Sequence, residues 1–326
     1  MGSMDKYSLG WLFKKTFNTA RHHRDGFLIK GKLCNNLIKN INGGVYLPPT
    51  AISEILDNNT IIKALPGVSE KTIDIIHKDY VIVFAVLSMG AKAHRITRFI
   101  GNVCDDDLPL QPVEKRSRIT NFFRNGDQNP IKLFQKWTKA ELEGFYRWQW
   151  AFKVPTFDLI DAAGRAAPHY DFDTATVLPL LRPEGGLSET FNEEDMGTFG
   201  EVSCVGNDPR CHEFYPMLNK LGITTKKFAL KILNGKIFKN EKPFQHEVEQ
   251  LHRFNGRINS HIITLLATFT FRGDMHFVFP WAECNLTTFW DFHPLERNVD
   301  FIRWISDPLH GLVCALWTIH EPQALG

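Results

Sequence analysis

The run FALKIL, residues 228 to 233, constrains the fold most because it places a lysine inside an apolar segment that is rich in strand formers. Strand alternation puts Lys231 on one face together with Ala229 and Leu233. If that face is covered, the ammonium group needs an anionic partner, since an unpaired buried charge is costly. We therefore predict a strand whose lysine faces a carboxylate or a bound anion.

A carboxylate for this lysine lies further along the chain, in a predicted helix from Phe244 to Phe254. Phe244, Val248 and Leu251 form the inward stripe of that helix. Glu247 flanks the stripe, since it lies three residues after Phe244 and four before Leu251. A Lys231–Glu247 ion pair would hold the lysine toward phosphate oxygens.

A glycine-containing segment, GTFGEV, precedes the lysine strand. Gly197 and Gly200 permit a tight turn whose backbone N–H groups can closely approach a phosphate. A single GxxG is weak evidence by itself, because most such pairs are plain turns. Beside the lysine strand and the glutamate helix, it indicates a phosphate-binding loop.

A second predicted strand, HFVFPWA, spans residues 276 to 282. We expect Pro280 to end its pairing, because proline has no N–H for a ladder bond. The backbone beyond the proline can then bond an adenine edge, and Pro280 keeps its carbonyl as an acceptor.

In this order, these four elements resemble the front half of the eukaryotic protein kinase superfamily, and more closely the kinase-domain proteins of filamentous fungi. The resemblance covers roughly residues 75 to 321 and implies ATP as the cofactor. The residues that it implies for cofactor binding are Gly197, Gly200, Val202, Ala229, Lys231, Glu247, Phe279, Pro280 and Ala282.

The resemblance also implies a role for individual residues. Lys231 would hold the α- and β-phosphates, with Glu247 as its helix partner. Phe279 would be the gatekeeper, and the Pro280 carbonyl and the Ala282 backbone would form the adenine-binding hinge. One position departs from the pattern: Asp195 stands where the first loop glycine is expected, which should weaken phosphate binding.

The predicted fold class is α+β, with two domains. Residues 1–155 form a mostly helical N-terminal domain for regulation or interaction, and residues 156–326 form a truncated kinase-like domain. The latter comprises an antiparallel N-lobe sheet with one helix, followed by the first helices of an incomplete C-lobe. Among the predicted helices are one capped by Thr50, one from Ser69 through Met89 that stops at Gly90, and one from Pro130 to Trp150.

The sequence ends at Gly326, about where a kinase would begin its catalytic loop. We expect a helix over Trp304 to His320, with Asp307 and Pro308 as its cap and first turn. No residue can be assigned as a catalytic base or as a magnesium ligand, so magnesium is expected only in a complete domain. The chain as given is therefore predicted to be catalytically inactive. The apolar face of the last helix is expected to need a protein partner or to limit solubility.

Composition narrows the class of partner. The net charge of +2 is too balanced to favour nucleic acid as the main partner. The longest apolar run, residues 81 to 89, is less than half of the ~20 residues needed to cross a bilayer. Six widely spaced cysteines fit buried free thiols in a reducing compartment. An intracellular protein, most simply cytoplasmic and without membrane contact, is the expectation.

Three readings follow from these features. The first is a Ser/Thr-type protein kinase family member whose sequence stops early. The second is a non-catalytic, pseudokinase-like binding or scaffold module, which Asp195 and the missing loop favour. The third is an unrelated α+β domain with chance matches.

Overall fold

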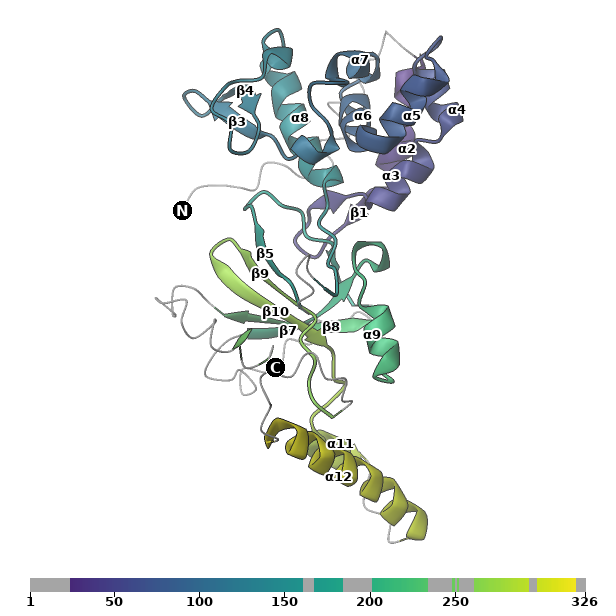
Figure 1. Ribbon diagram of the computed structural model, residues 1–326, viewed down its shortest axis with the longest axis vertical. Helices are drawn as coiled ribbons and strands as arrows, with labels where there is room; N and C mark the ends of the chain where they lie inside the picture. Colours follow the sequence, from purple (N-terminus) through teal and green to yellow (C-terminus); the bar gives the residue numbers. More distant parts are fainter. Residues whose placement is uncertain are drawn as a thin grey trace, which may run out of the picture. The chain divides into compact units, whose positions relative to one another are not determined.

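The computed structural model describes residues 24–160, 167–183, 201–233, 248–249, 251, 261–292 and 298–320 (Figure 1). The chain divides into two compact units. The first comprises Met1–Lys39 and Gly44–Val154, and the second comprises Asn40–Gly43 and Pro155–Gly326. Both helices and strands are present, as the predicted mixed class requires.

The first unit is built mainly from helices, with two small hairpins. Its α-helices are α2 (Arg24–Asn35), α3 (Pro49–Ile55), α4 (Asn58–Ala64), α5 (Glu70–Asp79), α6 (Val81–Met89), α7 (Ile96–Phe99) and α8 (Lys139–Phe152). Short 3-10 turns are η2 (Ala93–Arg95), η3 (Asp105–Asp107) and η4 (Lys132–Phe134). The hairpins pair β1 (Ile38–Lys39) with β2 (Val45–Tyr46) and β3 (Gln111–Glu114) with β4 (Ile119–Phe123).

Side-chain caps explain where several of these helices begin. The Ser69 hydroxyl accepts the Thr72 N–H at the start of α5. At the start of α8, Thr138 and Glu141 form a reciprocal capping box, which satisfies two backbone donors. The prediction that Gly90 follows the end of α6 is confirmed.

Three helix predictions were wrong. Thr50 does not cap α3, because Pro49 occupies the first turn and Thr50 falls inside the helix. The segment from Ser69 to Met89 is two helices that are separated at Tyr80. The segment from Pro130 to Trp150 is an α-helix only from Lys139 onward.

The break at Tyr80 has a long-range cause. Both carboxylate oxygens of Asp105 accept backbone N–H groups at the start of α6, from Ile82 and Val83, at 2.9 and 2.8 Å. The Asp105 carbonyl accepts the ammonium group of Lys153, at 2.8 Å. Asp105 thus supplies the N-terminal cap of a helix that begins more than 20 residues earlier in the chain.

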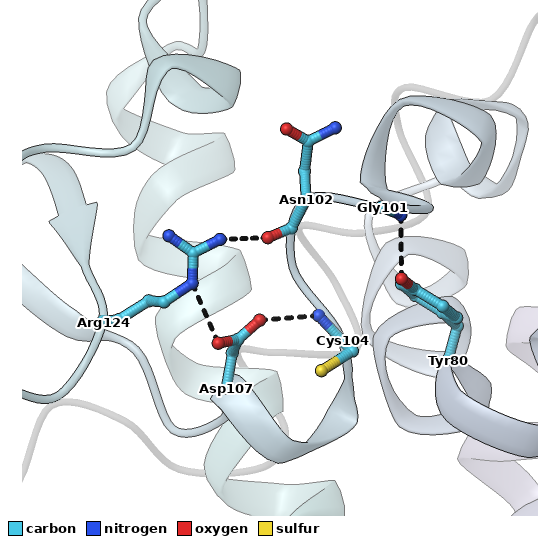
Figure 2. Close-up of polar contacts among 6 residues, drawn as sticks. All are labelled: Tyr80, Gly101, Asn102, Cys104, Asp107 and Arg124. Atoms are coloured by element: carbon cyan, nitrogen blue, oxygen red, sulfur yellow. Dashed lines mark hydrogen bonds and ion pairs between the residues drawn. The ribbon is translucent and has the colours of Figure 1, made fainter.

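A second polar network holds the same loop, and Figure 2 shows its members. Asp107 accepts the Cys104 N–H at 2.9 Å and the Arg124 Nε–H at 2.8 Å. Arg124 also donates to the Asn102 carbonyl. The Tyr80 hydroxyl accepts the Gly101 N–H at 2.8 Å, so the network reaches the junction between α5 and α6.

Aromatic side chains fill the core of the first unit. Phe134 lies 4.9 Å from Phe122, 5.0 Å from Trp137 and 5.1 Å from Phe145, between ring centroids. The crossing angles are steep, the geometry that aromatic pairs favour. This cluster joins α8 to the β3–β4 hairpin.

The second unit contains a six-stranded sheet in the order β5-β9-β10-β8-β7-β6 (Figure 1). The strands are β5 (His169–Phe172), β6 (Leu180–Leu181), β7 (Glu201–Asn207), β8 (Lys227–Leu233), β9 (Ala267–Phe271) and β10 (Asp274–Pro280). Neighbouring strands are antiparallel, as predicted, with one exception: β5 and β9 are parallel, so the prediction of an antiparallel sheet was wrong for this pair.

The two faces of this sheet have separate cores. Phe228, Leu230 and Val278 belong to the larger one, which also contains Leu218 of α9 (Tyr215–Lys220), Phe214 just before that helix, and Phe157. The 3-10 turn η6 (Pro209–Cys211) precedes α9. The opposite face carries the smaller cluster and the lysine of β8. The long segment between β7 and β8 therefore adds a covering helix rather than a tight hairpin turn.

Two helices follow the sheet in the chain: α11 (Leu286–Phe292) and α12 (Val299–His320). The Phe289 and Trp304 rings stack between them, with centroids 5.6 Å apart. The prediction that Asp307 and Pro308 begin the last helix was wrong, because α12 starts at Val299 and contains Pro308 in its interior. The helix continues through Pro308, although the proline removes one backbone N–H.

No helix in the described ranges is both long enough and apolar enough to cross a membrane. None of the six cysteines, all of which lie in the described ranges, forms a disulfide, and only Cys211 is buried. The expectation that the thiols are buried was therefore wrong for the others; Cys284 and Cys314 are exposed.

Candidate functional site

The residues with predicted roles that the structure describes lie on three adjacent strands, β7, β8 and β10, or just after them. Val202 lies on β7, Ala229 and Lys231 on β8, and Phe279 and Pro280 on β10. Ala282 follows β10 and is exposed. Gly197, Gly200 and Glu247 lie outside the described residues, as does Asp195.

The strand register brings the described residues onto one face. Lys231 lies directly opposite Val202 on β7 and opposite Phe277 on β10. Two residues before Lys231 on β8, Ala229 lies opposite Cys204 on β7 and Phe279 on β10. Because side chains opposite one another share a face, these six residues form one patch.

Lys231 is half-buried in this patch. Its Nζ lies 5.7 Å from the centroid of the Phe277 ring, and Phe277 is fully buried. A ring face attracts a cation at this distance. The patch thus brings the Lys231 ammonium group together with apolar side chains on one face of the sheet.

Two described residues that follow Glu247 in the sequence pack toward this patch. Val248 and Leu251 are helical and pack against the cluster formed by Leu233, Phe277 and Phe279. These two residues belong to the stripe that predicts the helix. Glu247 itself is not among the described residues, so its pairing with Lys231 stays a prediction.

The end of β10 differs from the expectation. Pro280 does not end the pairing with β8, because it lies opposite Phe228 and the next N–H, of Trp281, donates to the Lys227 carbonyl at 3.1 Å. The ladder with β9 ends earlier, at Val278. Proline is tolerated here since its missing N–H would lie on the side where β9 has already ended.

This geometry orients the Pro280 carbonyl. The Pro280–Trp281 peptide is trans, and in a trans peptide the carbonyl points opposite to the following N–H. Since the Trp281 N–H points to β8, the Pro280 carbonyl points away from β8, past the end of the β9 ladder. An acceptor is therefore directed to the side of β10 that no longer pairs with β9.

Sequence reasoning missed Phe277 and Cys204, which the register places in the same patch. The alternation of side chains between the two faces of each strand could have identified both residues. Phe277 precedes Phe279 by two residues, and Cys204 follows Val202 by two, so each shares a face with a residue that had been assigned.

Among the described residues, no group of three or more His, Cys, Asp or Glu side chains could hold a metal ion. The chain matches no family model and no curated protein sequence.

Proposed function

We propose that the second unit is a protein-kinase-like nucleotide-binding module of the Ser/Thr type, with ATP on the Lys231 face of the sheet. The observation that carries the proposal is the register of three adjacent strands. It gathers Val202, Ala229, Lys231 and Phe279 into one patch although they are spread over nearly 80 residues.

Each part of the patch fits one part of ATP. The Lys231 ammonium group provides a cation for the phosphates. Val202 and Ala229 offer an apolar surface beside it for a purine ring. The Pro280 carbonyl and the exposed backbone at Ala282 offer hydrogen-bond partners for an adenine edge.

The described residues contain no assigned catalytic base. We therefore propose nucleotide binding, and not phosphoryl transfer, as the activity of this chain. The alternative, a non-catalytic binding or scaffold module, is favoured by the apolar surface that α11 and α12 expose. The two readings are compatible if nucleotide binding stabilises the scaffold.

Titration of the full chain with a fluorescent ATP analogue tests the proposal. We expect saturable binding that ATP reverses fully, while inorganic tripolyphosphate competes only weakly because it lacks the purine. Adenosine should also compete, since it occupies the apolar half of the site. Absence of saturable binding, or equal competition by ATP and tripolyphosphate, would overturn the proposal.

A further inference from the structure

The surface of α11 and α12 is strongly apolar where it is exposed. Three side chains of α11 and nine of α12 are large, apolar and between about one-third and three-quarters exposed. They are Leu286, Trp290, Phe292, Val299, Ile302, Trp304, Leu309, Leu312, Val313, Leu316, Trp317 and Ile319.

The size of this surface exceeds what a monomer usually exposes. Four of them are aromatic side chains, which bury ~150–250 Å² each, and the others are smaller; at their exposed fractions the set presents on the order of 1,000 Å² of apolar area over both helices. The largest apolar patch on a typical monomer is about 300–600 Å². A standard interface buries about 800 Å² on each partner. A partner that covers both helices can thus bury enough area for a stable interface.

The pattern along α12 indicates what shape of partner fits. Apolar residues recur at alternating spacings of three and four: Ile302, Ile305, Leu309, Leu312, Leu316 and Ile319. This is the a/d pattern of a heptad repeat, in which knobs of one helix fill holes of another. Within this seam Ile305 is half-buried and the other five are exposed. On one side of the seam Ala315 is buried, whereas Val313 on the other side is exposed, so a second helix fits against the seam from the Val313 side.

The charges along α12 allow it to pair with a second copy of itself. In a coiled coil, charged residues at the e and g positions beside the seam select the partner. The positions beside this seam hold no acidic residue, lysine or arginine from Val299 to Ile319. Asp300, Arg303 and Asp307 fall at the b and f positions, away from the seam. A second copy of α12 can therefore approach without repulsion between like charges.

We propose that α12 pairs with α12 of a second copy of this chain, so that the protein is a homodimer. A two-fold pairing is self-complementary, because each seam residue meets the same set of residues on the partner. Pro308 removes one backbone N–H from α12, so we place the centre of the contact in the proline-free part that begins at Leu309. This inference does not depend on nucleotide binding.

Sedimentation equilibrium of the full chain at micromolar concentrations tests the proposal. We expect a monomer–dimer equilibrium, and the double variant Leu309→Glu, Leu316→Glu should raise the dissociation constant at least 100-fold. A matched control, His310→Glu with Cys314→Glu, adds the same charges on the same turns at exposed positions off the seam. It should leave the dissociation constant within about threefold of the parent.

Circular dichroism and thermal melting of both double variants check that the units remain folded. A parent chain that stays monomeric, a dimer that the seam variant does not weaken, or open-ended association that grows with concentration would each overturn the proposal. Loss of nucleotide binding in an intact dimer would instead count only against the proposed function.

Discussion

Cys204 lies directly opposite Ala229, on the same sheet face as Lys231. If ATP occupies this face, it covers the thiol. We expect saturating ATP to slow alkylation of Cys204 by iodoacetamide at least fivefold, measured by mass spectrometry of the labelled peptide. Cys284 lies on the exposed segment after β10 and serves as the internal control, with an unchanged rate. Equal rates at Cys204 with and without ATP would count against a nucleotide on this face.

Gln149 is expected to contribute strongly to the stability of the first unit. Its side chain is fully buried and bonds both backbone groups of Leu110, at 2.8 and 2.9 Å. Gln149→Ala removes both partners and leaves two buried backbone groups unsatisfied, so we expect a loss of about 2–4 kcal/mol. Urea denaturation measures this loss. The control Gln135→Ala, at an exposed position, should change stability by less than about 0.5 kcal/mol.

Asp105 should make the first unit less stable as the pH rises from about 4 to about 6. Burial is the main cause that raises the pKa of this carboxyl from 3.8 to about 6, and the N–H groups of Ile82 and Val83 act in the opposite direction. Between these values the folded state holds more protons than the unfolded state, so stability falls with rising pH. The expected change is on the order of 2–3 kcal/mol.

Urea denaturation of the parent and Asp105→Asn across this pH range isolates the effect, because the variant lacks the titrating carboxyl. Asp106→Asn at the exposed neighbour is the control. A difference between parent and Asp105→Asn that does not change with pH would contradict the assignment.

His212 should make the second unit less stable as the pH falls, the opposite of the effect of Asp105 on the first unit. Burial lowers its pKa from 6.5 to about 4, although Asp208 acts to raise it. The Nδ1 atom accepts the Phe214 N–H at 3.1 Å, which fixes the neutral tautomer. Between pH 6.5 and 4 the unfolded state holds more protons, so stability that is fully present above pH 6.5 is lost on acidification.

We expect His212→Asn to flatten this pH dependence, as followed by the melting of the second unit, since the Asn Oδ1 atom occupies the place of Nδ1 and can accept the Phe214 N–H without titrating in this range. His310→Asn, at an exposed position on α12, is the control. An unchanged slope in His212→Asn would argue that other groups govern the acid sensitivity.

Local signals predicted local structure well. The alternation of FALKIL identified β8, and Ser69 identified the start of α5. The signal for the start of α8 was also present, in the Thr138–Glu141 spacing of a capping box, but the apolar spacing around Leu133 extended the prediction too far toward the N-terminus.

Long-range contacts could not be predicted in this way. Periodicity runs without interruption through Tyr80, and the helix break there depends on a cap from Asp105. The parallel pairing of β5 with β9 joins segments almost 100 residues apart, and no local pattern encodes that choice. The candidate patch shows the same limit: alternation gave the face of each strand, but the register that joins the strands depends on tertiary packing.

Calorimetric titration of the full chain with ATP tests the central claim most directly, with Lys231→Met and Lys227→Met compared alongside. Both lysines lie on β8, but Lys227 is exposed at the start of the strand. We predict that the parent and Lys227→Met bind ATP with similar affinity. Lys231→Met should bind at least tenfold more weakly, a loss of about 1.4 kcal/mol. No heat of binding in the parent, or equal affinity in all three proteins, would contradict a nucleotide site on the Lys231 face.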